Sequence, residues 1–219
     1  MSITKKFAKV FGTILLLTGI ILLVMTIIYT DDSFWLSNVF HDKVYIYQWS
    51  VLYMAGVIYL DKFMTTPVLT RIGSRKRAAF VLLGIKFGFA FTYLCIVFSL
   101  IGMLAIIKCS HIPEKTTAEI LGIFVHYFMG FLLLSVFAEI FRRSENKFLS
   151  GNAHLCTILV LVLEQIIIVP QIMKYTPFKL YFIFSWIFYD GIAGYAALSA
   201  ILICALLYLF KVGIRKDIL

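Results

Sequence analysis

The longest apolar stretch of the sequence covers residues 79–107 and reads AFVLLGIKFGFAFTYLCIVFSLIGMLAII. It contains a single charged residue, Lys86. A helix crosses the hydrocarbon core of a bilayer with roughly 20 apolar residues, so this stretch is long enough to span with length to spare. Tilt, or projection beyond the bilayer, can accommodate the surplus. We therefore expect residues 79–107 to form a membrane span.

The composition extends this expectation to the whole chain. Of 219 residues, 62% are hydrophobic and only 14% are charged, whereas a soluble domain has about a quarter of its residues charged. Six spans of roughly 20 residues would use about 120 residues. The remainder leaves no room for a soluble catalytic domain, and we treat residues 1–219 as a single transmembrane domain.

The apolar segments predict an all-α, polytopic membrane protein with six spans. The N-terminal segment is longer than the core of a signal peptide and lacks a small-x-small cleavage site, so we expect it to be retained. The six predicted spans are residues 10–29, 44–60, 79–107, 120–140, 154–170 and 192–210.

The basic residues predict the orientation of these spans. With six spans, both termini share one side, and the excess of Lys and Arg marks that side as cytoplasmic. The other side carries only Lys43, Lys108, Lys115, Lys174 and Lys179. The predicted cytoplasmic side collects Lys5, Lys6, Lys9, Lys62, Arg71, Arg75, Lys76, Arg77, Arg142, Arg143, Lys147, Lys211, Arg215 and Lys216.

The loop between the second and third spans, residues 61–78, reads DKFMTTPVLTRIGSRKRA. Thr66 can cap a helix, Pro67 suits the first helical position, and Gly73 suits the position just past a helix end. These signals predict a short cytoplasmic helix near 67–72. A basic loop of this kind could contact only lipid headgroups, but its helix start and stop signals favour docking on a protein.

The segment before the sixth span has its own helix signals. Residues 178–210 would form one helix of about 50 Å, longer than the hydrocarbon core of about 30 Å. Thr176 and Pro177 suit a helix start, and Asp190 and Gly191 suit a break. We expect a re-entrant or interfacial outer helix over 177–189; a long, tilted sixth helix is the alternative. Asp190 and Gly191 would form an outer gate, or Asp190 would cap the last helix.

Four polar residues within the predicted spans are candidates for an intramembrane pathway, because exposing such groups to lipid is costly. Each also has a structural interpretation: hydrogen bonding between helices for Glu164 and for His126, and snorkelling to the cytoplasmic face for Lys86. Small residues at four-residue spacing, including Gly84 and Gly88, predict close helix packing. The four candidates are Glu164, Gln165, His126 and Lys86.

Catalytic and metal-binding motifs are missing from the sequence. It has no GxxxxGK[ST] phosphate loop and no HExxH pair. Its four cysteines are scattered and form no CxxC pair. We therefore expect no catalytic residues, no metal site and no cofactor bound by this chain.

Taken together, the six spans, the loop element and the outer helix resemble the membrane subunit of an ABC-2-type ABC transporter. The stretch from Tyr59 to Arg77, with Arg71-Ile72-Gly73-Ser74-Arg75, is similar to the R-x-G-S-R loops of small bacterial permeases for bacteriocin or peptide export and lantibiotic immunity. The tail before the first span is shorter than in larger members of that family.

The resemblance implies a function and partners. The loop would dock on a separate cytoplasmic ABC ATPase that binds ATP and Mg, and two permease copies would line a pathway in a bacterial cytoplasmic membrane. No nucleic acid is expected. The residues implied in ATPase coupling are Pro67, Val68, Leu69, Thr70, Arg71, Ile72, Gly73, Ser74, Arg75, Lys76 and Arg77.

Alternative functions remain open on the sequence alone. A stand-alone immunity or binding protein would share the composition and need no ATPase. A six-span substrate-binding subunit of a vitamin transporter would bind a small vitamin by itself. For an exporter, the aromatic outer segment and the few charges within the spans favour an amphipathic or hydrophobic cargo, such as a peptide or a lipid-like compound.

Overall fold

The computed structural model describes residues 3–28, 39–72, 75–108, 117–164, 183–188 and 192–216. Within these ranges, the side chains of 3–7, 10, 42, 63–72, 75–79, 108, 117–118, 185, 188 and 212–216 are outside the description. These residues are helical or lie in short turns, and they contain no strand. The helices are α1 (Ile3–Ile28), α3 (Asp42–Val44), a π-helical turn η1 (Tyr45–Trp49), α4 (Ser50–Ile72), α5 (Arg75–Lys108), α6 (Thr117–Arg142), α7 (Lys147–Gly151), α8 (Ala153–Leu163), a 3₁₀ turn η4 (Phe184–Phe188) and α10 (Ile192–Lys216).

Four of these helices are long and apolar enough to cross a membrane. Their apolar segments are Phe11–Ile28, Phe80–Ile107, Glu119–Arg142 and Ile192–Lys211, and they coincide with four of the six predicted spans. The predicted span at 44–60 falls on the end of α3, η1 and the first half of α4, which are not among these four helices. The predicted span at 154–170 falls on the shorter apolar helix Ala153–Leu163, and residues 165–170 lie outside the description.

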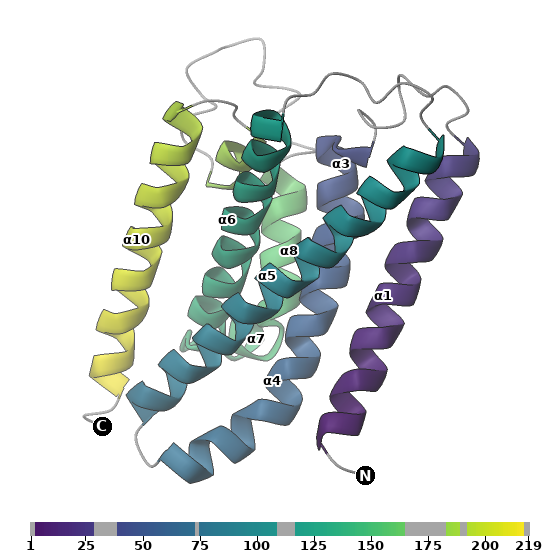
Figure 1. Ribbon diagram of the computed structural model, residues 1–219. Helices are drawn as coiled ribbons and strands as arrows, with labels where there is room; N and C mark the ends of the chain where they lie inside the picture. The colour runs from purple at the N-terminus through teal and green to yellow at the C-terminus, as the bar shows by residue number, and fades with distance from the viewer. Residues whose placement is uncertain are drawn as a thin grey trace.

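The long helices form a bundle around α6, which contacts α4, α5, α8 and α10. In Figure 1, α5 crosses the front of the bundle diagonally, with α1 and α10 at opposite sides. The start of α1, the end of α4, the start of α5 and the end of α10 lie at the same end of the bundle (Figure 1). We call this end the basal end.

The short coupling helix expected near 67–72 is not a separate element. Helix α4 continues from Ser50 to Ile72 and includes Thr66 and Pro67 in its interior. A proline inside a helix removes one backbone hydrogen bond and favours a kink without always ending the helix. Figure 1 shows the last part of α4 swung sideways at the basal end. The expected stop agrees with the structure, because α4 ends at Ile72, one residue before Gly73.

The outer helix expected over 177–189 is described only in part. Residues Phe184–Phe188 form one short 3₁₀ turn, η4, while 177–182 and 189 lie outside the described residues. Within that turn Phe184 and Ile187 are buried, and η4 contacts α6 and α10. The described part of this segment is therefore packed against the bundle.

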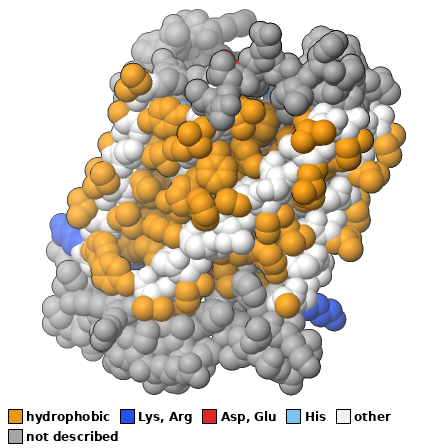
Figure 2. Space-filling model, viewed as in Figure 1, with side chains coloured by type: hydrophobic (Ala, Val, Ile, Leu, Met, Phe, Trp, Pro, Cys, Tyr) orange, Lys and Arg blue, Asp and Glu red, His pale blue; other side chains and the backbone are white. Residues whose placement is uncertain are grey.

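The core is an aromatic cluster between η1, α4, α5 and α6. The rings of Tyr45 and Tyr53 both stack on Phe131, with centroids 5.2 Å and 4.5 Å away. Outside the core, many large apolar side chains of α1, α5 and α10 are exposed. They form a broad hydrophobic surface across the middle of the molecule in Figure 2, with Lys or Arg side chains at its lower margin. This surface suits contact with lipid.

Helices pack closely at some glycines, but not at Gly84 and Gly88, where close packing was expected. A Cβ atom at Gly84 or Gly88 would meet nothing within 4 Å, so the packing expectation was wrong for these two positions. At Gly56, by contrast, it would lie 2.6 Å from the Cε1 atom of Phe89. At Gly122 it would lie 2.9 Å from the hydroxyl of Tyr195. The tight contacts therefore join α4 to α5 and α6 to α10.

Candidate functional site: a buried charge network

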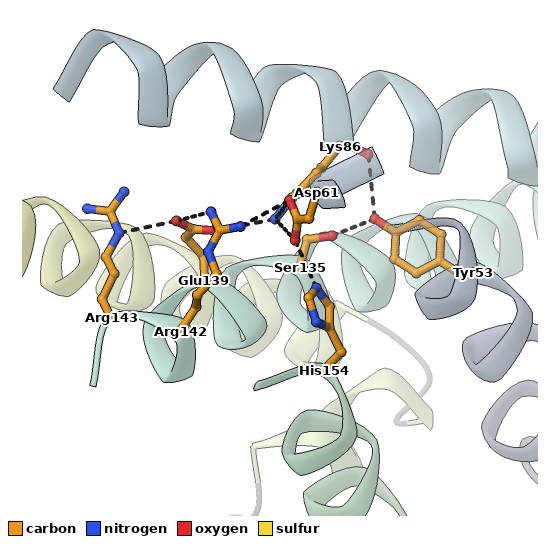
Figure 3. A network of polar contacts seen from close by, with 8 residues as sticks. All are labelled: Tyr53, Asp61, Lys86, Ser135, Glu139, Arg142, Arg143 and His154. Atoms are coloured by element: carbon orange, nitrogen blue, oxygen red, sulfur yellow. Dashed lines mark hydrogen bonds and ion pairs between the residues drawn. The ribbon is translucent and has the colours of Figure 1, made fainter. Parts of the chain in front are cut away.

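Lys86 lies at the centre of a network of ion pairs inside the bundle. Its side chain is only 2% exposed, and its Nζ atom lies 2.8 Å from Oδ1 of Asp61 and 3.3 Å from Oε2 of Glu139. The three residues come from α5, α4 and α6. Snorkelling of Lys86 to the membrane surface was therefore a wrong expectation: the ammonium group points inward because two carboxylates receive it there (Figure 3).

Two arginines, the last residue of α6 and the residue after it, also form ion pairs with these carboxylates. The NH2 atom of Arg142 lies 2.6 Å from Oε2 of Glu139, and its NH1 atom lies 3.3 Å from Oδ1 of Asp61. The Nε atom of Arg143 lies 3.2 Å from Oε1 of Glu139. The positions i, i+3 and i+4 share one side of a helix, so the local geometry of α6 brings Glu139 to both arginines.

A histidine from α8 joins the network at Asp61. The Nε2 atom of His154 lies 2.8 Å from Oδ2 of Asp61. Lys86 and Arg142 place their positive charges against the other oxygen of this carboxyl, Oδ1. Asp61 is therefore a carboxylate at neutral pH, and it connects α4 to α5, α6 and α8.

A pair of hydroxyl groups lies beside the charges. The side-chain oxygens of Tyr53 and Ser135 are 2.5 Å apart, and the Tyr53 hydroxyl donates to the backbone carbonyl of Lys86 at 3.5 Å. Both side chains are fully buried. This pair adds a second polar connection between α4, α5 and α6 (Figure 3).

The network is suited to holding helices in one arrangement. Removing charges from water costs several kcal/mol per ion, and this cost is offset only when each charge has well-placed partners. Asp61 and Glu139 each contact more than one cation. Four helices must therefore keep their relative positions for these contacts to persist, and the contacts would change together if the helices moved.

Glu164, one of the expected intramembrane candidates, has a backbone partner. Its Oε2 atom accepts a hydrogen bond of 2.7 Å from the backbone N–H of Phe184, and its side chain is buried. The contact joins the residue that follows α8 to the 3₁₀ turn η4, 20 residues later. The structural interpretation of Glu164 as a connector between elements has this geometric support.

His126, a second candidate, belongs to α6, and its ring contacts Tyr195 of α10. Its Nδ1 atom is 3.2 Å from the carbonyl oxygen of Gly122, and its ring centroid is 3.8 Å from that of Tyr195. Its Nε2 atom is buried and has no hydrogen-bond partner among the described residues. His126 is far along α6 from Glu139 and does not join the charge network.

The remaining expected site residues lie outside the described residues or outside the described side chains. Gln165, Asp190 and Gly191 are not described, and neither are Gly73 and Ser74. The backbone of the expected coupling segment is helical up to Ile72 and again from Arg75. The side chains of this segment lie outside the description.

Glu139 and His154 were not found by the sequence analysis, and Asp61 was assigned only to a loop. The sequence did contain an indication of acidic partners, because a lysine within a span needs an anionic partner. Glu139 is the acidic residue closest to the basic end of the fourth apolar segment, and Asp61 follows the second directly. The positive-inside pattern drew attention to Arg142 and Arg143 as surface charges instead.

Among the residues whose placement is described, no group of three or more His, Cys, Asp or Glu side chains could hold a metal ion. No protein-family model, no curated protein and no solved structure matches this chain. Its function is therefore inferred from its own sequence and geometry.

Proposed function

We propose that this chain is the membrane permease subunit of an ATP-driven ABC exporter, in a bacterial cytoplasmic membrane with both termini in the cytoplasm. The observation that supports it most is the α4–α5 hairpin. Its basic turn lies at the basal end with both termini (Figure 1). Eleven residues from the adjoining ends of α4 and α5, Asp61 and Lys86 bind each other and the carboxylate or guanidinium groups of α6.

The six-span architecture belongs to this proposal. The helical residues 42–72 would extend over about 46 Å, more than the roughly 30 Å of the hydrocarbon core. They therefore provide enough length for a second span even though α4 carries charges. The 11 residues of α8 cover only about 16 Å, so a fifth span requires the helix to continue beyond Leu163.

In this mechanism the segment 67–77 receives the movement of the ATPase, which binds ATP and Mg. Asp61 lies six residues before Pro67, and Lys86 lies nine residues after Arg77. A displacement of the hairpin would therefore act first on the charge network, and through Glu139 and His154 on α6 and α8. The ATPase can shift the bundle only as far as it binds one arrangement better than the other.

The proposed cargo is an amphipathic or hydrophobic compound, such as a peptide, an antimicrobial or a lipid-like molecule. The described core is aromatic, and its charged groups are paired with one another. A ring of unpaired charged side chains, one of the ways in which channels select ions, is not seen in the described part of the core. A second permease copy would complete the pathway.

The test is a mild-detergent affinity purification of the tagged full chain from its native membrane, with mass spectrometry of the co-purified proteins. A P-loop ATPase near one-to-one stoichiometry is expected. Replacing Arg71 with Glu, or Leu69 with Pro, should abolish this association while membrane insertion is retained. Lys147→Glu is the matched control, because it changes a basic residue of the same predicted side outside the hairpin.

Two outcomes would contradict the proposal. Purification without any ATPase would favour a stand-alone immunity or binding protein. Loss of the ATPase from Lys147→Glu as well as from Arg71→Glu would indicate a general charge effect rather than docking of the hairpin.

A further inference from the structure

Four side chains of the charge network form a closed ring of contacts. In order around the ring they are Lys86, Asp61, Arg142 and Glu139, so that cations and carboxylates alternate (Figure 3). Lys86 and Asp61 come from the α4–α5 hairpin, whereas Arg142 and Glu139 both come from α6. We call this set the four-charge ring. It joins two parts of the bundle, the hairpin and α6.

The contacts around the four-charge ring are alternately short and long. The short ones lie within one part of the bundle: Lys86 Nζ is 2.8 Å from Asp61 Oδ1, and the NH2 atom of Arg142 is 2.6 Å from Glu139 Oε2. The long ones, both 3.3 Å, join the hairpin to α6. They connect Lys86 Nζ to Glu139 Oε2, and the NH1 atom of Arg142 to Asp61 Oδ1. Each cation therefore has one near carboxylate and one more distant carboxylate.

The same four charges can be paired in a second way. If the short and long contacts were exchanged, Lys86 would pair with Glu139 and Arg142 with Asp61, and both ion pairs would then join the hairpin to α6. The number of ion pairs stays the same. Because no charge loses its partner, the exchange avoids the cost of leaving a buried ion alone.

The movement needed for this exchange is small. The two contacts of Asp61 Oδ1 differ by 0.5 Å, from 2.8 to 3.3 Å, and those of Glu139 Oε2 differ by 0.7 Å, from 2.6 to 3.3 Å. Packed interfaces tend to have discrete arrangements instead of deforming continuously, so that shifts below 1 Å can separate two states. The four-charge ring has the geometry of such an interface.

A neighbouring contact between the hairpin and α6 can act as the pivot. Ser135 lies one turn before Glu139 on α6, and its side-chain oxygen is 2.5 Å from the Tyr53 hydroxyl of α4. The Tyr53 ring also stacks on Phe131 of α6, with the centroids 4.5 Å apart. A tilt of the hairpin about this contact would change the distances in the four-charge ring and leave the aromatic core in place.

Asp61 would pass the movement on to α8. Its Oδ2 atom lies 2.8 Å from Nε2 of His154, whereas its Oδ1 atom is the one that contacts both Lys86 and Arg142. Helix α8 can therefore stay attached to Asp61 in both pairings. In the second pairing, Asp61 would connect α8 to Arg142 by two short contacts.

We propose that the four-charge ring is a two-state element that exchanges its ion pairs when the α4–α5 hairpin moves against α6. The observed pairing is one state, in which the hairpin and α6 each hold a short ion pair of their own. In the other state, two short ion pairs hold the hairpin against α6. This proposal does not depend on the exporter function, because any partner or ligand that binds one state better would shift the exchange.

The experiment follows the Nζ atom of Lys86 by NMR, in the purified full chain with ¹⁵N-labelled lysine side chains in a neutral detergent. The signal is identified by its absence from Lys86→Arg. Two variants provide reference positions for the two states. Glu139→Gln leaves Lys86 with Asp61, as in the observed pairing, and Asp61→Asn leaves Lys86 with Glu139, as in the second pairing.

We expect the wild-type protein to show both states. Collective helix movements take microseconds to milliseconds. Fast exchange would place the wild-type signal between the two reference positions, and slow exchange would give two separate signals. Lys147→Gln is the matched control, because it removes a positive charge from an exposed residue outside the four-charge ring. It should leave the Lys86 signal as it is in the wild type.

Two results would overturn the proposal. A single wild-type signal at the position of Glu139→Gln would show one fixed pairing. A shift in Lys147→Gln as large as that in Glu139→Gln would show a general effect of charge.

If the neutral variants do not fold, Glu139→Asp takes their place, because it keeps the charge and shortens its reach by one methylene. It should lower the share of the second state, seen as a shifted signal or as the loss of one of two signals. An unchanged Lys86 signal in Glu139→Asp would equally overturn the exchange.

Discussion

At the scale of single residues, Lys86 shows how strongly a charge inside a membrane protein depends on its partners. Its side chain is almost fully enclosed, yet Asp61 and Glu139 lie within 3.3 Å of its Nζ atom. An isolated ammonium in that position would be strongly destabilising. Lys86 therefore stabilises the fold when the carboxylates of Asp61 and Glu139 are present and would destabilise it without them.

This dependence leads to a prediction for Lys86→Met. Removing the ammonium leaves two buried carboxylates with fewer partners, and we expect a loss of about 3 kcal/mol in the free energy of unfolding. The double variant Asp61→Asn with Lys86→Met should recover a large part of this loss, because it removes one charge of each sign. Thermal or denaturant unfolding in detergent measures both.

Additive effects of the two substitutions would argue against this coupling. In that case Asp61 and Lys86 would contribute independently, and the contact between them would have no net energetic role.

At the scale of helices, one glycine position fixes the distance between α4 and α5. Phe89 of α5 packs against the backbone of Gly56 and stacks with Tyr53 at 5.6 Å. A side chain at position 56 would also approach Cδ1 of Ile14 to 3.1 Å. Three helices therefore meet at a point where only a hydrogen atom fits.

We expect Gly56→Ala and Gly84→Ala to have opposite effects on stability. The added methyl at position 56 would displace Phe89 and cost about 1–3 kcal/mol, as overpacking does. At position 84 it meets open space, and alanine's higher helix propensity should stabilise α5 by up to about 1 kcal/mol. Unfolding temperatures in one detergent compare the two; equal changes would contradict the packing described.

Some helices could be predicted from the sequence more accurately than others. The apolar lengths of α1, α5, α6 and α10 located all four, because length and apolarity alone determine a candidate span. The local cap signals at Thr66 and Pro67 misplaced a helix start, because a continuous helix tolerated the proline. That Lys86 needs acidic partners could be expected from the sequence; which ones it has could not, since the contacts join residues 25 and 53 positions apart.

At the scale of the whole molecule, the arrangement separates a basal end from the opposite end. The start of α1, the end of α10 and the α4–α5 turn share the basal end (Figure 1). The charge network extends from the middle of α4, at Asp61, to the last residue of α6, Arg142. An even number of membrane crossings would produce this placement of the two helix ends.

The topology makes a direct prediction. Reporter fusions at the C-terminus and after residue 73 should both be cytoplasmic, whereas a reporter after residue 112, between α5 and α6, should be on the outer side. Green fluorescent protein and alkaline phosphatase fusions distinguish the two sides. Opposite locations for the C-terminus and residue 73 would contradict the bundle's arrangement.

The charge network also sets an order for biosynthesis. Asp61 is synthesised 25 residues before Lys86 and 93 residues before His154. At about 5–20 residues per second, the ribosome needs roughly 5 to 20 seconds to cover the longer interval. During that time Asp61 cannot rest alone in lipid, where a charge at a helix centre costs several kcal/mol. During synthesis, α4 must therefore remain in contact with water or with the insertion machinery until α5, α6 and α8 have been made. These helices carry the residues that pair with Asp61.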